Sequence, residues 1–428
     1  MDQAALQIPD SPEPRAHATP EVYGYLFILC FLVLSPGGVI YTPIQFIYKD
    51  QLHLTADQTA IFKLIVNVPG YLAFVFGILR DRFNPFRMGD RGFLLIFGLA
   101  SAAILSAMSQ MPLTRWTVGL GLIIWSLATG MIGAAFQAIL RNVADSRMMS
   151  GRVSTVLHTM GAGVGAVALL GGGWLVDHAS WREQIGLVSG LCLCIALLGL
   201  WKAPSVFEAA GSARSTNFAK LWSEAKQLRH YRAYWIAVVI WTVWNFTPPG
   251  GTPMQYYLRD VLKVSGTQYG SYTALLAVAF LPTALLFGPL CKRYRLWPLM
   301  LVATAFAIPQ WVPVIFVKNM NQVYAGAIVI GLAGGFGNAA YYAILLRACP
   351  RALAGSGMLV ASGLCLVGIE LGNVLGGYLY RIGGFPICAI VTTATYALLL
   401  PLCFLVPRRL VTPRDDEYVP TEEELVAA

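Results

Sequence analysis

The sequence predicts an all-α integral membrane protein in which twelve transmembrane helices form two pseudo-symmetric six-helix bundles. The first indication is composition: 57% of the 428 residues are hydrophobic and only 12% are charged, whereas about a quarter of the residues in a soluble domain are charged. The second is a series of twelve apolar segments, each close to the roughly 20 residues that cross a bilayer. The third is an internal repeat that relates the first six segments to the last six.

The repeat is clearest where the first apolar segment of each half ends. Residues 42–58 contain Thr-Pro-Ile-Gln-Phe, then Lys-Asp, Leu and Gln, and residues 252–268 contain Thr-Pro-Met-Gln-Tyr, then Arg-Asp, Leu and Gln, 210 positions later. A second match relates residues 134–140 to residues 339–345 at an offset of 205. Such fixed offsets indicate two homologous halves, each opening with the same helix–loop–helix.

The chain divides into five parts. Residues 1–21 contain acidic residues and prolines without the apolar run of a signal peptide, so we expect a disordered cytosolic tail. Six-helix bundles are expected at 22–202 and 233–406, and the basic linker 203–232 has apolar residues at the spacing of an amphipathic helix. Residues 407–428 form a second cytosolic tail, too acidic to fold. The apolar segments lie near residues 22–48, 58–80, 92–112, 116–140, 151–176, 184–202, 233–257, 268–290, 297–317, 322–346, 355–380 and 385–406.

The distribution of positive charge predicts the orientation. Most of the 30 Lys and Arg residues lie in the termini, in the linker and in the loops after even-numbered segments. By the positive-inside rule these parts are cytosolic, which makes the chain a multi-pass inner-membrane protein with both termini in the cytoplasm. The net charge of +9 therefore needs no nucleic-acid partner. The eight cysteines offer neither an outward-facing disulfide pair nor a set of metal ligands, so we expect no metal and no cofactor.

A basic motif follows the second segment. Its aspartate, Asp81, can cap a helix end and pair with arginines that reach a neighbouring helix, forming a latch that holds one conformation and breaks in the other. The motif resembles the loop 2–3 signature of the major facilitator superfamily, and the glycines of segments 5 and 11 resemble its glycine-rich helices at the interface between the halves. Because Lys292 replaces the aspartate in the second half, we expect a weaker latch there. The latch residues are Gly77, Asp81, Arg82, Arg87 and Arg91.

Residues 43–92 show a closer resemblance within that superfamily. Lys49 to Leu54, Pro69 and Gly89 are among the positions that resemble the folate-biopterin transporter family, followed by the related muropeptide permease and acetyl-CoA transporter group. The resemblance implies a secondary transporter and not an enzyme. After Pro69, however, the family pattern has tryptophan and lysine where this chain has Gly-Tyr-Leu-Ala-Phe, which leaves a different substrate open.

Polar side chains inside the membrane mark the expected transport pathway, because lipid does not tolerate them. Glu370, in the middle of segment 11, is either a proton carrier or a permanently neutral acid bonded to a neighbouring helix. His158 either titrates near neutral pH, as a second proton-coupling residue, or only packs. Lys63 either binds an anionic substrate or extends to the membrane surface.

The superfamily arrangement implies that segments 1, 4, 7 and 10 line a central cavity. Amides and aromatic rings there would suit a planar hydrogen-bonding solute such as a pterin, although drugs, sugars and peptides fit as well. Prolines and glycines at 36–38 and 248–251 are expected to interrupt their helices. The expected substrate-binding residues are Tyr41, Gln45, Lys63, Asn67, Gln137, Trp244, Asn245, Gln255, Asn338, Tyr341, Tyr342 and Asn373.

Three functions from different classes are compatible with the sequence. The leading hypothesis is a monomeric secondary transporter that works by alternating access, coupled to protons through Glu370, for a pterin-like solute or for a muropeptide or siderophore. The second is a membrane-embedded transferase, and the third a receptor that keeps the fold without transport. No nucleotide-binding loop is present, and the linker is too short for an ATPase domain, which excludes a primary pump. The expected partners are the solute, protons and lipid.

Overall fold

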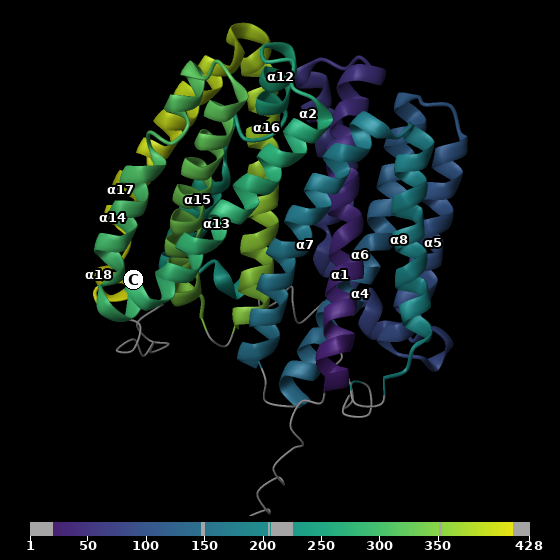
Figure 1. Ribbon diagram of the computed structural model, residues 1–428. Helices are drawn as coiled ribbons and strands as arrows, with labels where there is room; N and C mark the ends of the chain where they lie inside the picture. The colour runs from purple at the N-terminus through teal and green to yellow at the C-terminus, as the bar shows by residue number, and fades with distance from the viewer. Residues whose placement is uncertain (1–19, 147–149, 204–205, 207–225, 351–352, 414–428) are drawn as a thin grey trace, which may run out of the picture.

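The computed structural model describes residues 20–146, 150–203, 206, 226–350 and 353–413. Within these ranges every regular element is a helix, and the helices form two bundles that stand side by side (Figure 1). The predicted tails 1–21 and 407–428 and the linker 203–232 lie largely outside the described residues. Apolar cores fill both halves: one buried cluster lies almost entirely in the C-terminal half, and two lie in the N-terminal half.

The N-terminal half comprises the first six spans. Its helices are α1 (Pro20–Phe46), the π-helix η1 (Ile47–Gln51), α2 (Ala56–Val66), α3 (Val68–Tyr71), α4 (Ala73–Arg82), η2 (Pro85–Arg87), α5 (Asp90–Gln110), α6 (Arg115–Ser146), α7 (Ser150–His178) and α8 (Trp181–Leu200). The C-terminal half comprises α11 (Arg232–Asn245), α12 (Thr252–Asp260), α13 (Gly266–Arg293), α14 (Leu296–Ala307), η3 (Val312–Phe316), α15 (Met320–Ala348), α16 (Ala354–Ala397), α17 (Leu399–Leu405) and α18 (Arg408–Val411).

The twelve predicted spans are confirmed, although only nine helices within the described residues are long and apolar enough to cross a membrane individually. Span 2 is divided among α2, α3 and α4, because Pro69 cannot continue the hydrogen-bond ladder that ends at Asn67. Span 7 is divided between α11 and α12. Spans 11 and 12 run on through α16 and α17, bending at Gly384, whose φ of 70° suits glycine.

The two predicted helix interruptions behave differently. Residues 248–251 separate α11 from α12, as expected, because two consecutive prolines remove two backbone donors. The expected break at residues 36–38 is wrong: α1 continues through them as one helix. Gly38 is instead a packing position, since a Cβ there would lie 2.6 Å from the Cβ of Ala168 on α7.

The helix–loop–helix repeat is confirmed in its details. Thr55 with Gln58, and Ser265 with Gln268, form matching capping boxes at the starts of α2 and α13. The turns before them use the same backbone, with φ of 49° at His53 and 53° at Lys263. The turns and the helix starts that follow them therefore share a conformation, whereas the residues before the turns differ: Ile47–Gln51 form a π-helix and Thr252–Asp260 an α-helix.

Candidate functional site

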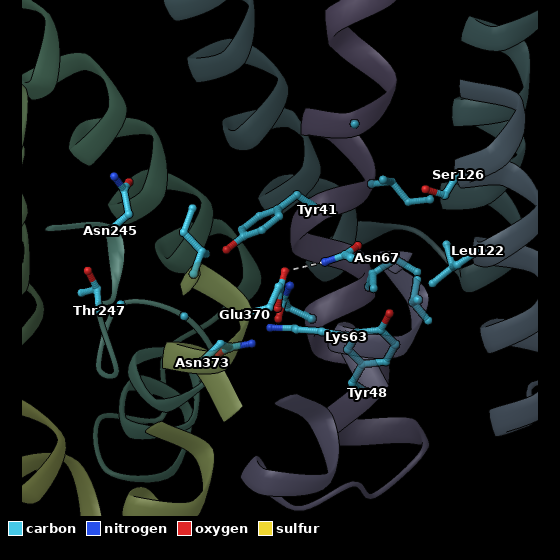
Figure 2. Close-up of a pocket in the computed structure, with 18 of the residues that line it drawn as sticks. Tyr41, Tyr48, Lys63, Asn67, Leu122, Ser126, Asn245, Thr247, Glu370 and Asn373 are labelled. Atoms are coloured by element: carbon cyan, nitrogen blue, oxygen red, sulfur yellow. Dashed lines mark hydrogen bonds between the residues drawn. The ribbon is translucent and has the colours of Figure 1, made fainter. Parts of the chain in front are cut away.

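A cavity of about 620 Å³ lies between the two halves (Figure 2). The N-terminal half lines it with α1, η1, α2 and α6. The C-terminal half contributes α11, the 246–251 break, α13, Trp311 and α16. Because both halves form its walls, a relative rotation of the halves changes access to this cavity.

Seven of the residues expected from the sequence come together in this cavity. They include the carboxyl group of Glu370 and the ammonium group of Lys63, which reaches the cavity and not the membrane surface. Lys63 and Glu370 were expected because each is a charged group within an apolar span, whereas Tyr41, Gln45 and Asn245 were expected from the superfamily arrangement. The seven are Tyr41, Gln45, Lys63, Asn67, Asn245, Glu370 and Asn373.

The remaining six expected binding residues do not line the cavity. Trp244 and Tyr341 are buried in the core of the C-terminal half, with ring centroids 5.2 Å apart. Gln255 is buried and donates to the carbonyl oxygen of Gln45 at 2.6 Å, so it joins the halves. The other three, on α6 and α15, are Gln137, Asn338 and Tyr342. The side chain of His158, on α7, lies outside the described part of the structure.

Glu370 is bonded across the interface between the halves. Asn67 Nδ2 donates to Glu370 Oε1 at 2.7 Å (Figure 2). Asn67 lies at the break between α2 and α3, where the chain turns its amide toward α16. A carboxylate accepting from an amide N–H makes a charge-assisted bond, so the ionised form of Glu370 binds α2 most strongly.

Lys63, one helical turn before Asn67, makes a second hydrogen bond between the halves. Its Nζ donates to Thr252 Oγ1 at 2.8 Å, and the backbone N–H of Thr252 donates to Asn373 Oδ1 at 2.9 Å. Asn373 lies one turn from Glu370 on α16. Lys63, Asn67, Thr252, Glu370 and Asn373 thus form a cluster, here called the polar ring, whose hydrogen bonds join span 2 to α12 and to α16, and α12 to α16.

Two features of the cavity could not be found from the sequence. Trp125 and Ser126 line it from α6, the expected helix, but about three turns from the expected Gln137. Trp311 lines it from the connection between α14 and η3, which no sequence pattern marks. Gln45 Oε1 is buried without a hydrogen-bond partner, which leaves an acceptor available to a solute.

Beyond the polar ring, crossed ion pairs join the halves at the end of the molecule that carries α12 and the start of α2 (Figure 1). Lys49 Nζ lies 2.5 Å from Asp260 Oδ1, and Arg259 Nη2 lies 2.8 Å from Asp50 Oδ2. Each cation of the repeated dipeptide therefore pairs with the anion of the other copy. Thr59 and Tyr256 add a hydroxyl–hydroxyl bond of 2.7 Å beneath them.

Close helix contacts flank the crossed ion pairs on both sides. A Cβ at Gly173 on α7 would lie 2.5 Å from the carbonyl oxygen of Gly266 on α13. On the other side, a Cβ at Gly377 on α16 would lie 2.7 Å from the carbonyl oxygen of Ala56 on α2. These contacts confirm that the glycine-rich segments 5 and 11 meet the opposite half. The crossed ion pairs, these two flanks and the polar ring are together called the seal.

Contacts at the opposite end stay within one half. The side chain of Arg80 forms a two-bond ion pair with Asp90, at 2.5 and 3.0 Å, and Arg91 Nη2 donates to the carbonyl oxygen of Leu200 at 2.5 Å. The hydrogen bonds and ion pairs that join the halves within the described residues lie at the sealed end. One end of the interface is therefore closed by polar contacts that the other end lacks among those residues.

The predicted latch motif lies at this second end. Arg82 and Arg87 are exposed, and the side chain of Asp81 lies outside the described part of the structure. A Cβ at Gly77 would meet no atom within 4 Å, so no neighbouring helix packs closely against this glycine in the present arrangement. Within the described part of the chain, no group of His, Cys, Asp and Glu side chains could hold a metal ion.

Two pseudo-symmetric six-helix halves around a shared cavity define a transporter of the Major Facilitator Superfamily, whose family model matches residues 251–427. The model of the BT1 family matches residues 37–328, and the chain belongs to this family. A comparison with curated protein sequences gave no match.

Several solved transporter structures have a similar fold. A mutant of the nucleoside transporter NupG has a TM-score of 0.71 and 15% identity, over 89% of this chain and 98% of its own. A bacterial homologue of the human lysosomal transporter Spinster has a TM-score of 0.64 and 14% identity, over 95% of this chain and 100% of its own. A mutant of the peptide transporter POT has a TM-score of 0.69 and 13% identity, over 91% of this chain and 95% of its own. At these identities the likeness concerns the fold alone.

Proposed function

We propose that this protein is a proton-coupled secondary transporter that moves a small polar organic solute, of planar pterin or folate type, across the inner membrane by alternating access. The observation that carries the proposal is the position of the cavity: it lies between the two halves, and the polar contacts that join these halves among the described residues lie at one end. A rocking motion that breaks the seal and closes the opposite end would expose the same cavity to the other side.

The proposed orientation follows from the cations. The termini, the linker and the loops after even-numbered segments carry most of the Lys and Arg residues, so we place their end of the molecule in the cytoplasm. In this proposed orientation the seal faces outward, and the cavity is accessible from the cytoplasmic side. In this orientation Lys49, Asp50, Arg259 and Asp260 form the outermost layer between the cavity and the external medium.

The lining of the cavity supports a planar solute. Tyr41 and Trp125 offer aromatic faces, while Gln45 and Asn245 offer amide groups for heteroatoms. Lys63 is the one basic side chain among the lining residues, which favours a solute with an acidic group. Muropeptides and siderophores remain the alternative substrates, and the name of NupG adds nucleosides as a planar class to be tested.

Glu370 is the proposed proton carrier. It is a carboxyl group in the wall of the cavity, and its bond to Asn67 depends on which half-to-half contacts are formed. A carboxyl group whose partners change between two conformations binds protons with different affinity in each, which is the requirement for coupling. His158 remains a predicted second participant.

Reconstitution in liposomes with an internal pH dye tests this function. We expect a pterin, folate, muropeptide, siderophore or nucleoside to drive proton movement with the wild-type protein. Glu370→Gln should abolish that movement, whereas Glu183→Gln, the same change in an exposed capping box, should not. Solute-driven proton movement that survives in Glu370→Gln would remove Glu370 from the mechanism. Absence of any solute flux would favour a receptor or a transferase.

A further inference from the structure

We infer that Asn67 and Lys63 are the positioning residues through which protonation of Glu370 releases the seal. The inference rests on the proposed role of Glu370 as the proton carrier. It adds that the proton site and the outer closure are one structure, because the carboxylate of Glu370 accepts one of the bonds that hold the halves together.

The geometry of the polar ring places both bonds on one helix face. Lys63 and Asn67 are four residues apart on span 2, so both side chains point to the C-terminal half. Their acceptors are Thr252 and Glu370, and Asn373 connects the two by bonding the backbone of Thr252. Separation of α2 from α16 and α12 would therefore break both bonds together.

The charges around Glu370 are few. Lys63 faces it from α2, and the phenol groups of Tyr41 on α1, Tyr48 on η1 and Tyr71 on α3 lie within electrostatic range. Among these groups Lys63 alone is basic, and the others are phenols. No ion pair joins Lys63 to Glu370 in the described residues, since each is bonded to a neutral group of the opposite half.

The direction of the effect follows from these partners. In the sealed arrangement the carboxylate of Glu370 accepts a charge-assisted bond from Asn67, and adding a proton to the carboxylate weakens that bond. Loss of the bond removes a contact that holds α2 against α16, so protonation favours the unsealed state. Acidification should open the outer end, and Asn67 should transmit that response.

Distances across the seal, measured on full-length protein in nanodiscs, test this inference. Spin labels at His53→Cys and Lys263→Cys, in the exposed turns of the two repeats, report opening in a Cys194→Ser background. We expect the population with the longer distance to rise at least threefold from pH 8 to pH 5. In Asn67→Leu this population should already be raised at pH 8 and change less than 1.5-fold with pH, as in Glu370→Gln. Asn67→Gln should restore part of the response.

Thr59→Val is the matched control. It removes another bond between the halves, to Tyr256, without touching the ring, so it should weaken the seal and keep the pH response. A wild-type pH response in Asn67→Leu would overturn the inference, even with Glu370→Gln uncoupled from proton movement in liposomes. Conversely, an Asn67-dependent pH response in a protein without proton-coupled flux would support the inference and refute the proposed coupling.

Discussion

The two flanks of the seal are equivalent by the internal repeat but use different electrostatics. Gly173 and Gly377 occupy matching positions 204 residues apart and make the same close contact with the opposite half. Four residues further on, the chain has Asp177 on one flank and Arg381 on the other. Duplication thus preserved the steric contact, while the charge beside it diverged.

Each flank of the seal has a carboxylate at a helix N-terminus. Asp177 reaches across the interface and accepts the backbone N–H groups of Gly266 and Thr267, both at 2.8 Å, at the start of α13. On the other flank the carboxylate belongs to α2 itself: Asp57, which pairs with Arg381 at 3.0 Å. The first arrangement joins the halves through a helix terminus and two charge-assisted bonds.

The second arrangement is weaker, because Arg381 is 55% exposed and such a pair is screened by water and salt. The comparison teaches that the seal should open asymmetrically. The α16–α2 flank, which also carries Glu370 and Asn67, should loosen first, and the α7–α13 flank should act as the pivot.

The largest expected effect comes from the steric contact of the pivot. Gly173→Val places a side chain 2.5 Å from the carbonyl oxygen of Gly266 and 2.8 Å from the Cα of Gly270, and backbone atoms cannot move aside easily. Overpacking costs about 1–3 kcal/mol even where side chains can adjust. Solute uptake into liposomes should fall to background. Gly171→Val is the control, because a Cβ at Gly171 meets nothing within 4 Å; equal loss in both variants would contradict the prediction.

The next effect concerns the charge of the pivot. Asp177→Asn keeps the size of the side chain but loses the charge that strengthens the bonds from Gly266 and Thr267. A loss of about 1–2 kcal/mol corresponds to roughly a tenfold shift toward the unsealed population. The spin labels at residues 53 and 263 measure that shift. An unchanged distance distribution would show that the pivot depends on the glycines alone.

Between the flanks, a charge exchange tests the crossed ion pairs. Lys49→Asp places two carboxylates together and should favour the unsealed population about threefold to fivefold, since half-exposed pairs contribute up to about 1 kcal/mol. Lys49→Asp combined with Asp260→Lys restores opposite charges and should recover most of the sealed population. Failure of the double variant to recover would mean that Lys49 acts through its contact with the Tyr256 ring.

The smallest effect is expected at the exposed pair of the weaker flank. Arg381→Gln should shift the distance distribution less than about threefold, and the shift should vanish at about 1 M salt, where the Debye length is about 3 Å. Asp177→Asn measured at the same two salt concentrations provides the contrast, because its partners are backbone N–H groups. A larger effect of Arg381→Gln than of Asp177→Asn would reverse the assignment of the pivot.

The fold could be predicted because its signals are repeated. Hydrophobic segments set the number of spans, and a constant offset revealed the duplication that the capping boxes at Thr55 and Ser265 later confirmed. The pairing of Lys49 with Asp260 and of Arg259 with Asp50 could not be predicted, since it depends on how the halves are placed in space. Pro36 was misjudged because one proline in a long helix costs a single backbone bond, which packing against α7 can offset.

The site was predicted in part, for a physical reason. A charge or amide within an apolar span has few places to lie, which led to Lys63, Asn67 and Glu370. An aromatic ring is accommodated equally well in a core or a cavity, so the sequence could not show that Trp244 and Tyr341 pack against each other. The polar ring itself also requires Thr252, which the internal repeat marks as a matching position but not as a partner of Lys63.

The reciprocal dipeptides have a consequence for the origin of the protein. A cation followed by an anion is complementary to itself under a twofold rotation, which is the property of an isologous dimer interface. An ancestral polypeptide of half this length could therefore have bound a second copy of itself through the same four charges. Gene fusion would then have linked two subunits that already formed a dimer, and later substitutions would have made the two halves differ.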